Sequence, residues 1–255
     1  MALAYDDAGS GPCVVLIHGH PFNRTLWDPQ RDALADRYRV VTPDLRGFGE
    51  SPVHAGTVTM RELASDVEAL LDALNVAAAA VVGLSMGGLV AMELAIPAPE
   101  RWWALGLVAT TAEPITEDER RDRLAMAETT EREGMQPLAR RMDAGLFGPD
   151  RDEAAAAHVM EMMLATDPRG AAAALRGRAQ RPDYRPNLAA LDVPSFVCVG
   201  DRDPWSTGEV TDALVGLLRR PRTLVLPGVG HLPNLEATAR FNEALLAFLE
   251  EARRG

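Results

Sequence analysis

Short apolar runs recur along the chain, and stretches with helical spacing lie between them. The runs carry hydrophobic residues at almost every position rather than at alternate ones, which is typical of strands buried on both faces of a parallel sheet. Their approximate ranges are 13–17, 38–42, 76–82, 104–109, 195–199 and 223–226. Helical spacing is clearest over 60–74, and Thr59 with Glu62 gives the signature of a capping box in front of it. The pattern predicts an α/β fold in which helices cover both faces of a mostly parallel sheet.

Residues 113–190 differ in pattern from the rest of the chain. They contain 15 acidic residues and 12 arginines with helical spacing, and no apolar run of the strand type. We expect residues 1–112 and 191–255 to form one α/β core, with 113–190 inserted as a helical cap, or lid. Six of the ten methionines lie in this insertion: Met126, Met135, Met142, Met160, Met162 and Met163. Because flexible thioethers adapt to varied apolar ligands, this enrichment predicts a cap that covers a binding pocket.

Ser85 stands at the junction between the apolar run 76–82 and a following helical pattern. Gly83 and Gly87 flank it at two residues on either side, which leaves room for a tight turn with strained backbone angles. Such a turn lifts a serine hydroxyl clear of a sheet and places it beside the first amides of a helix. Two other interpretations are an ordinary glycine-rich loop and, because residues 76–92 are uncharged, a short membrane span. The glycines and serine at the centre of the stretch, and an acidic residue directly after it, disfavour the span.

Charge and composition narrow the classes of partner. The formal net charge is −11, and no more than two arginines stand next to each other, so neither nucleic acids nor anionic membranes are expected as partners. All 26 basic residues are arginine, which excludes Schiff-base lysines, Ser–Lys dyads and phosphate-binding P-loops. Cys13 and Cys198 both lie within apolar runs and are expected to be buried thiols. Acidic residues near the N-terminus do not fit a signal peptide, so we expect a cytoplasmic protein with a small-molecule substrate.

Candidate catalytic residues follow three of the predicted strands. Ser85, an acid at Asp201 or Asp203, and then His231 occur in this chain order, and parallel strands bring their carboxyl ends to one edge of a sheet. A serine needs a histidine to remove its proton, and the histidine needs a carboxylate to fix its tautomer. The order Ser, Asp, His is the order of the nucleophile-elbow triad. The sequence therefore predicts nucleophilic catalysis by Ser85.

Such a reaction passes through an oxyanion that needs fixed N–H donors. The backbone amide of Met86, at the start of the predicted helix, and that of His20, in the loop after the first long apolar run, are the candidate donors. No spacing of His, Cys or Glu suggests a metal site, and no cofactor is expected.

Five stretches of the sequence occur together in an order that one fold family shares. They are His18-Gly19-His20-Pro21 with Trp27 downstream, Asp44-Leu45-Arg46-Gly47-Phe48-Gly49-Glu50-Ser51, Gly83-Leu84-Ser85-Met86-Gly87, Gly200-Asp201-Arg202-Asp203 and Gly230-His231. With them the chain resembles the capped α/β-hydrolases, in particular the branch of cofactor-free haloperoxidases, small esterases and 3-oxoadipate enol-lactonases. The resemblance implies that the acid is Asp203 rather than Asp201. His20 departs from that branch, which usually has an apolar residue there, so its side chain is expected to add a donor or a second titrating group near the site.

These residues predict a serine hydrolase that cleaves an ester, lactone or thioester through an acyl-enzyme. The alternatives are C–C bond hydrolysis or perhydrolysis by the same triad, and a non-catalytic ligand-binding protein. Trp27, Met126, Met142 and Trp205 are the candidate pocket residues, whose aromatic and thioether surfaces favour a small, mainly apolar substrate. A carboxylate-bearing lactone would instead require arginines that face inward. Because the arginines of the insertion are mixed with acidic residues, we expect most of them to pair at the surface.

Overall fold

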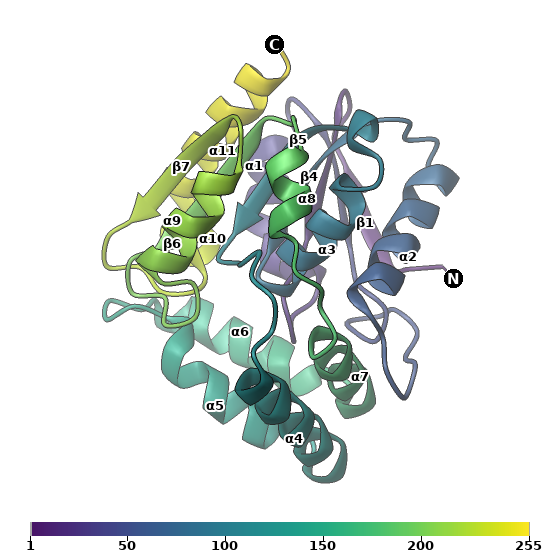
Figure 1. The fold of residues 1–255 in the computed structure, drawn as a ribbon, viewed down its shortest axis with the longest axis vertical. Coiled ribbons are helices and arrows are strands. Elements are labelled where there is room, and N and C mark those ends of the chain that lie inside the picture. Colours follow the sequence, from purple (N-terminus) through teal and green to yellow (C-terminus); the bar gives the residue numbers. More distant parts are fainter. Residues whose placement is uncertain (1, 255) are drawn as a thin grey trace.

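Seven strands form a single sheet in the computed structural model, which describes residues 2–254 (Figure 1). The strand order across the sheet is β1-β3-β2-β4-β5-β6-β7. The strands are Tyr5–Ala8 (β1), Cys13–Ile17 (β2), Arg39–Pro43 (β3), Ala79–Leu84 (β4), Trp102–Val108 (β5), Ser195–Gly200 (β6) and Pro221–Leu226 (β7). Every neighbouring pair is parallel except β1 and β3, which pair antiparallel. The predicted α/β fold with a mostly parallel sheet is therefore confirmed.

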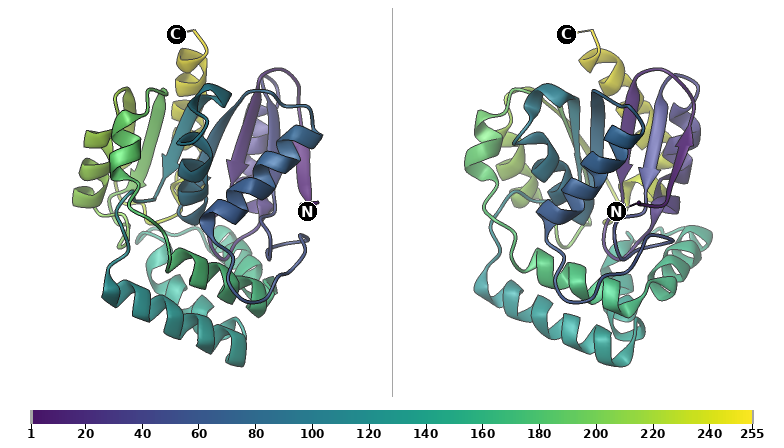
Figure 2. Two further views of the ribbon diagram at one scale, coloured as in Figure 1. Left: turned by 45° about the vertical axis from the view of Figure 1, so that its right-hand side comes forward. Right: turned by 90° about the vertical axis from the view of Figure 1, so that its right-hand side faces the viewer.

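Helices cover both faces of this sheet (Figures 1 and 2). Buried apolar side chains of one face belong to the helices Met60–Ala73 (α2), Met86–Ala95 (α3), Arg185–Ala190 (α8) and Gly208–Leu217 (α9). The other face packs against Asp28–Leu34 (α1) and Thr238–Ala252 (α11). Shorter pieces are Pro233–Glu236 (α10) and the 3₁₀ turns Arg24–Trp27 and Pro99–Arg101. This double cover explains why the inner strands β2 to β6 are mostly apolar, because both of their faces are shielded from water, whereas the edge strands β1 and β7 are largely exposed.

The strand before Ser85 starts three residues later than the apolar run suggests. Val76 donates its N–H to the carbonyl of Leu71, and Asn75 has φ 55°, so the chain there closes the end of α2 rather than starting a strand. Pairing with β2 begins at Ala79, which lies opposite Cys13. The stretch 76–92, which could be read as a membrane span, is divided between β4 and α3, and no helix within residues 2–254 is long and apolar enough to cross a membrane.

Four helices form a separate layer across the carboxyl ends of the strands (Figures 1 and 2). They are Glu117–Glu133 (α4), Gln136–Leu146 (α5), Glu153–Ala165 (α6) and Pro168–Arg178 (α7), and we call them the helical layer. Side chains of α4, α5 and α7 make a small apolar cluster of their own. Val159, Met162 and Met163 of α6 instead belong to the apolar core on the face of the sheet covered by α1 and α11, which we call the main core. The last part of 113–190 behaves differently, because α8 lies beside α9 along the sheet (Figure 1).

Candidate active site

Ser85 occupies the turn between β4 and α3 with φ 54° and ψ −112°, a conformation that side-chain-bearing residues rarely adopt. The two flanking glycines make the turn possible. A Cβ on Gly83 would overlap the carbonyl oxygen of Gly87, and a Cβ on Gly87 would overlap that of Ile17. Neighbouring strands hold the strained turn, because the Ser85 N–H donates to the carbonyl of Val108 at 2.8 Å. The local geometry is the one that the Gly-x-Ser-x-Gly pattern predicts.

His231 and Asp203 are paired beneath the cavity that Ser85 lines. Nδ1 of His231 lies 2.7 Å from Oδ2 of Asp203, and both side chains are buried. Burial alone would raise the pKa of the Asp203 carboxyl, but the charge and hydrogen bond of His231, with two backbone amides of the same loop, outweigh it and lower that pKa. Since an ionised carboxylate only accepts, Nδ1 of His231 donates to it, which leaves Nε2 as the ring nitrogen that can accept a proton. Asp201 lies outside this pair and accepts the N–H of Gly228 at 2.7 Å.

The loop that carries His231 is tied to the end of the helical layer. The backbone N–H of His231 donates to the carbonyl oxygen of Leu146 at 2.8 Å. The Glu236 carboxylate accepts the amides of Gly230 at 2.9 Å and of Gly148 at 2.6 Å, and also that of Leu232 at 3.3 Å. One carboxylate therefore joins the residues on both sides of His231 to the segment that follows α5.

Replacing Glu236 with glutamine should destabilise the protein by about 1.5–3 kcal/mol, because the amide loses the charge and one of the two acceptor oxygens that these three N–H groups share. Urea unfolding of the variant and of Glu243→Gln measures the difference. Glu243 lies on α11 and is exposed, so its variant should stay within about 0.5 kcal/mol of the parent. Equal stabilities of the two variants would mean that the Glu236 contacts do not hold this loop.

Two backbone amides lie close to Ser85 and have no acceptor among residues 2–254. One belongs to Met86, the first residue of α3, and the other to His20 in the loop after β2. A Cβ on Gly19 would come within 3.3 Å of Cβ of Ser85, so the loop passes directly beside the serine. His18 fixes this loop, because its Nε2 accepts the Leu45 N–H at 3.0 Å. Both amides are thus available to a bound oxyanion.

The His20 side chain does not behave as the titrating group that the sequence left open. Nε2 lies 3.0 Å from the carbonyl oxygen of Ala171 in α7, so this nitrogen carries the proton and donates. Burial, followed by the charge of Arg178, lowers the pKa of His20 to about 3. The ring is neutral at physiological pH, and its donor is already used in holding α7 against the loop after β2.

A cavity of about 280 Å³ opens above Ser85, between the sheet edge and the helical layer. Ser85, His231, His20 and Thr110 line its floor, and the helical layer contributes Met126, Leu138, Met142 and Leu175. The ring of Trp205 also lines it and stands edge-on to His231, with 4.8 Å between ring centroids. Met126, Met142 and Trp205 are therefore placed on the cavity wall. Trp27 is not: it is fully buried against Phe241 on the other side of the fold, so its assignment to the pocket is wrong.

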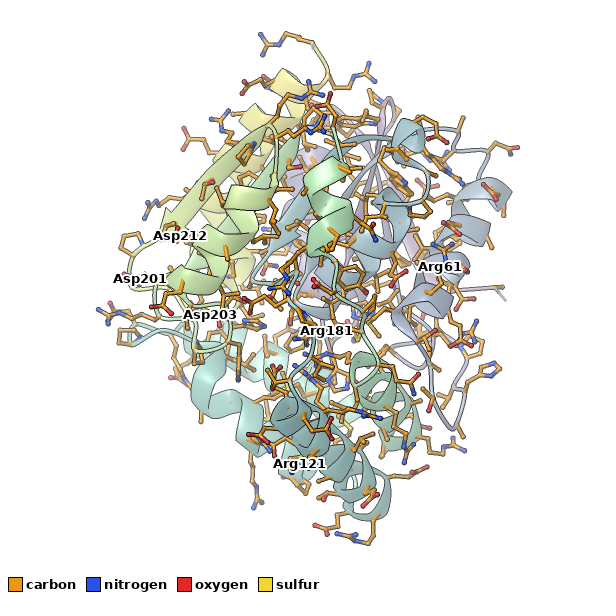
Figure 3. The ribbon with its side chains drawn as sticks, in the orientation of Figure 1. Arg61, Arg121, Arg181, Asp201, Asp203 and Asp212 are labelled. Atoms are coloured by element: carbon orange, nitrogen blue, oxygen red, sulfur yellow. The ribbon has the colours of Figure 1, made fainter. Side chains whose placement is uncertain are left out.

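Most arginines of the insertion pair at the surface as expected, and one of them, Arg141, lines the cavity while it pairs with Asp122. Three further arginines on the cavity wall are exceptions. Arg123 comes from α4, Arg178 is the last residue of α7, and Arg181 follows in the next loop. Figure 3 shows Arg181 and Asp203 where the helical layer meets the sheet edge. One signal in the sequence pointed to such residues, because the range 168–182 holds four arginines and no acidic residue.

Known proteins share this fold and much of this sequence. A model of the alpha/beta hydrolase family matches residues 14–244. The 3-oxoadipate enol-lactonase 1 of Acinetobacter baylyi is 30% identical over 94% of this chain and 90% of its own length. A thermophilic esterase from Thermogutta terrifontis, solved with malate bound, superposes with a TM-score of 0.96 at 37% identity over 98% of this chain and 93% of that one.

The enol-lactonase of Burkholderia xenovorans LB400 superposes with a TM-score of 0.90 at 29% identity, over 97% of this chain and 96% of that one. The esterases and enol-lactonases named by the resemblance are thus among the relatives found, and they are enzymes. Because the family match extends from the second strand into the last helix, the chain belongs to the α/β-hydrolase family of enzymes.

Proposed function

We propose that the protein is a serine hydrolase that cleaves a carboxylic ester or lactone through an acyl-enzyme on Ser85. The observation that carries this proposal is the buried His231–Asp203 hydrogen bond at 2.7 Å, whose histidine lines the same cavity as Ser85. A hydrogen-bonded pair of this kind has no structural need to face a cavity. Its position is the one required of a base that takes the proton of a neighbouring serine.

Acylation would begin with attack of Ser85 Oγ on the scissile carbonyl carbon while Nε2 of His231 takes the hydroxyl proton. The carbonyl π electrons move to its oxygen, and the amides of His20 and Met86 donate to the resulting oxyanion. When the carbonyl re-forms, the bond to the leaving oxygen breaks and His231 returns the proton to that oxygen. Asp203 stays ionised and stabilises the imidazolium in between.

Deacylation would repeat these steps with water in place of the serine. Nε2 of His231 removes a proton from the water, the hydroxide adds to the acyl carbon, and the proton passes to Ser85 Oγ as the ester bond breaks. The acid product leaves and the free enzyme is restored. In a lactone the leaving oxygen remains attached to the acyl chain, so the product is a single hydroxy or keto acid.

The size of the cavity supports a small substrate. Its volume of about 280 Å³ lies near the lower end of the range for ligand pockets, which is about 300–1,000 Å³. The helical layer closes one side of it, and we propose that this layer acts as the cap over the substrate. The relatives found include an esterase and enol-lactonases of nearly the same length, which supports ester or lactone cleavage here.

A fluorophosphonate probe, with mass-spectrometric mapping of the adduct, tests the proposal together with a panel of p-nitrophenyl esters, lactones and acyl thioesters. We expect one adduct on Ser85, turnover of an ester or lactone, and a rapid release of about one equivalent of p-nitrophenol as the acyl-enzyme forms. A protein that binds panel members but neither reacts with the probe nor turns them over would be a ligand-binding member of the family. An adduct on another residue would refute the assignment of Ser85.

A further inference from the structure

The arginines on the cavity wall carry more positive charge than the acidic residues beside them can neutralise. Of the acidic residues that line the cavity, Asp122 pairs with Arg141, and both of those side chains are well exposed. Glu119 is left for the three arginines and lies 3.5 Å from Arg181 and 3.7 Å from Arg123. This excess of positive charge lies inside a chain whose net charge is −11.

Arg178 is the least satisfied of the three. Within residues 2–254 its guanidinium forms no hydrogen bond and no ion pair, and its Nε is buried without an acceptor. The residue is half-buried and lines the cavity. A buried N–H donor without an acceptor is costly, and a guanidinium presents five donors in one plane. The side chain therefore lacks an acceptor group on the cavity side.

The other two arginines also lack hydrogen-bond acceptors, Arg123 more than Arg181. Nη1 of Arg123 is buried without an acceptor, whereas Arg181 donates to the carbonyl oxygens of Glu113 and Pro114 at 3.0 and 3.4 Å. Burial, then the charges of its two neighbours, lowers the pKa of Arg178 well below its usual value, and burial lowers the pKa of Arg123 to about 10. An anion between them would oppose both effects, since an opposite charge favours the protonated form.

Arg178 cannot easily reach solvent through a shift of its helix, because α7 is packed backbone to backbone against two loops. A Cβ on Gly170 would overlap the carbonyl oxygen of Gly47, and one on Gly177 would overlap that of Val58. The N–H of Val58 also donates to the carbonyl of Ala173 at 3.1 Å. The unpaired guanidinium is therefore held at the cavity wall by the fold.

We propose that Arg178, Arg123 and Arg181 form an anion site that binds a carboxylate carried by the substrate, apart from the group that is hydrolysed. The inference rests on the proposed function, and it replaces the mainly apolar substrate predicted from the sequence. A planar guanidinium matches the two oxygens of a carboxylate. Met126, Leu138, Met142 and Leu175 line the same cavity, so a short carbon chain between the carboxylate and the scissile carbonyl would contact an apolar wall. The substrate class is a small half-ester or lactone acid.

Binding to the inactive Ser85→Ala protein tests the anion site without any chemistry. Titration calorimetry with glutarate, its neutral diamide and inorganic phosphate should show tight binding of glutarate alone. Adding Arg178→Gln should weaken glutarate binding by about 10–100-fold, which is the range for loss of hydrogen bonds to a charged group. Equal affinity for glutarate and the diamide, or no effect of Arg178→Gln, would overturn the proposal. Stronger binding of phosphate than of glutarate would overturn the choice of a carboxylate.

Arg121→Gln provides the matched control, because it removes the same charge from the helix that carries Arg123. Arg121 is 69% exposed and pairs with Asp118, and Figure 3 shows it on α4 away from Arg181 and Asp203. Its variant should bind glutarate within about twofold of the parent, as expected for an exposed pair. Arg178→Gln should melt no lower than the parent without ligand, since it removes an unpaired, half-buried cation. A lower melting temperature would contradict the view that Arg178 lacks a partner.

Kinetics separate a failure of this site from a failure of the proposed function. In the wild-type protein, kcat/KM should be at least about tenfold higher for p-nitrophenyl hemiglutarate than for p-nitrophenyl valerate. Arg178→Gln should abolish that preference, whereas the control Arg121→Gln should keep it. Turnover with a preference for valerate would refute the anion site and leave the hydrolase intact. If no ester is cleaved but glutarate binding depends on Arg178, the hydrolase proposal fails and the anion site stands.

Discussion

Replacing Ser85 with alanine should lower kcat for ester or lactone hydrolysis by about 10⁶-fold, the scale measured when the nucleophile of a serine hydrolase is removed. In the proposed mechanism the Ser85 hydroxyl forms the acyl-enzyme, and neither the two proposed oxyanion donors nor His231 can replace it. The substitution keeps the Cβ, so the turn with φ 54° gains no new atom that could clash. Single-turnover kinetics on the best ester of the panel, with circular dichroism to verify the fold, measure the effect.

Ser206 is the matched control, because it is a second serine on the wall of the same cavity. It follows the acid loop and stands outside the Ser85 turn, so Ser206→Ala should retain activity within about tenfold of the parent. If Ser206→Ala were the inactive variant and Ser85→Ala the active one, the nucleophile would have been misassigned. Loss of the fluorophosphonate adduct should follow the same pattern as loss of activity.

The candidate site residues could be located from the sequence because each lies in the segment that follows a strand. Chain order determines which residues leave the carboxyl ends of parallel strands, and these ends meet at one edge. Ser85 follows β4, Asp203 comes shortly after β6, and His231 comes shortly after β7. The sequence left both Asp201 and Asp203 open until the family resemblance favoured the second. In the structure Asp203 contacts His231, whereas Asp201 accepts an amide of the loop after β7.

Residues whose role depends on packing direction could not be placed in this way. Trp27 is apolar and aromatic, and nothing in its neighbours indicates whether it faces the cavity or the core. The structure places it under α11, where its ring contacts Phe241 at 6.2 Å between centroids. Met162 and Met163 likewise serve the main core, while Met126 and Met142 reach the cavity. Residue type alone does not separate these cases.

The partners of the arginines could not be predicted from the sequence either, because they too depend on how the helices pack. Between 168 and 182 the chain has four arginines and no acid, so their partners had to come from elsewhere. Arg176 finds Glu131 on α4, and Arg169 pairs with Asp167 just before α7. Arg178 finds no partner within residues 2–254. The packing of α7 against α4 determines which arginine stays unpaired. A count of charges in the sequence does not reveal this packing.

Replacing Asp203 with asparagine should slow acylation by about 10⁴-fold, the loss seen for the corresponding change in a serine protease. The amide keeps the size of the carboxylate but removes its charge, and its NH₂ group can favour the wrong tautomer of His231. Asp201→Asn is the control, because Asp201 is partly exposed and lies outside the His231 pair, so its kcat/KM should stay within about tenfold of the parent.

The pH dependence of the free energy of unfolding gives a second test of the role proposed for Asp203. Its pKa is lowered in the folded protein, so its ionised form stabilises the fold above the pKa of an unfolded aspartate, about 3.9. That contribution is lost as the pH falls through the lower, folded value. The stability difference between the parent and Asp203→Asn should therefore shrink as the pH falls below about 4. Urea unfolding from about pH 5 down to pH 2 measures it, and a difference that does not shrink in this range would show that the pKa of Asp203 is not lowered by folding.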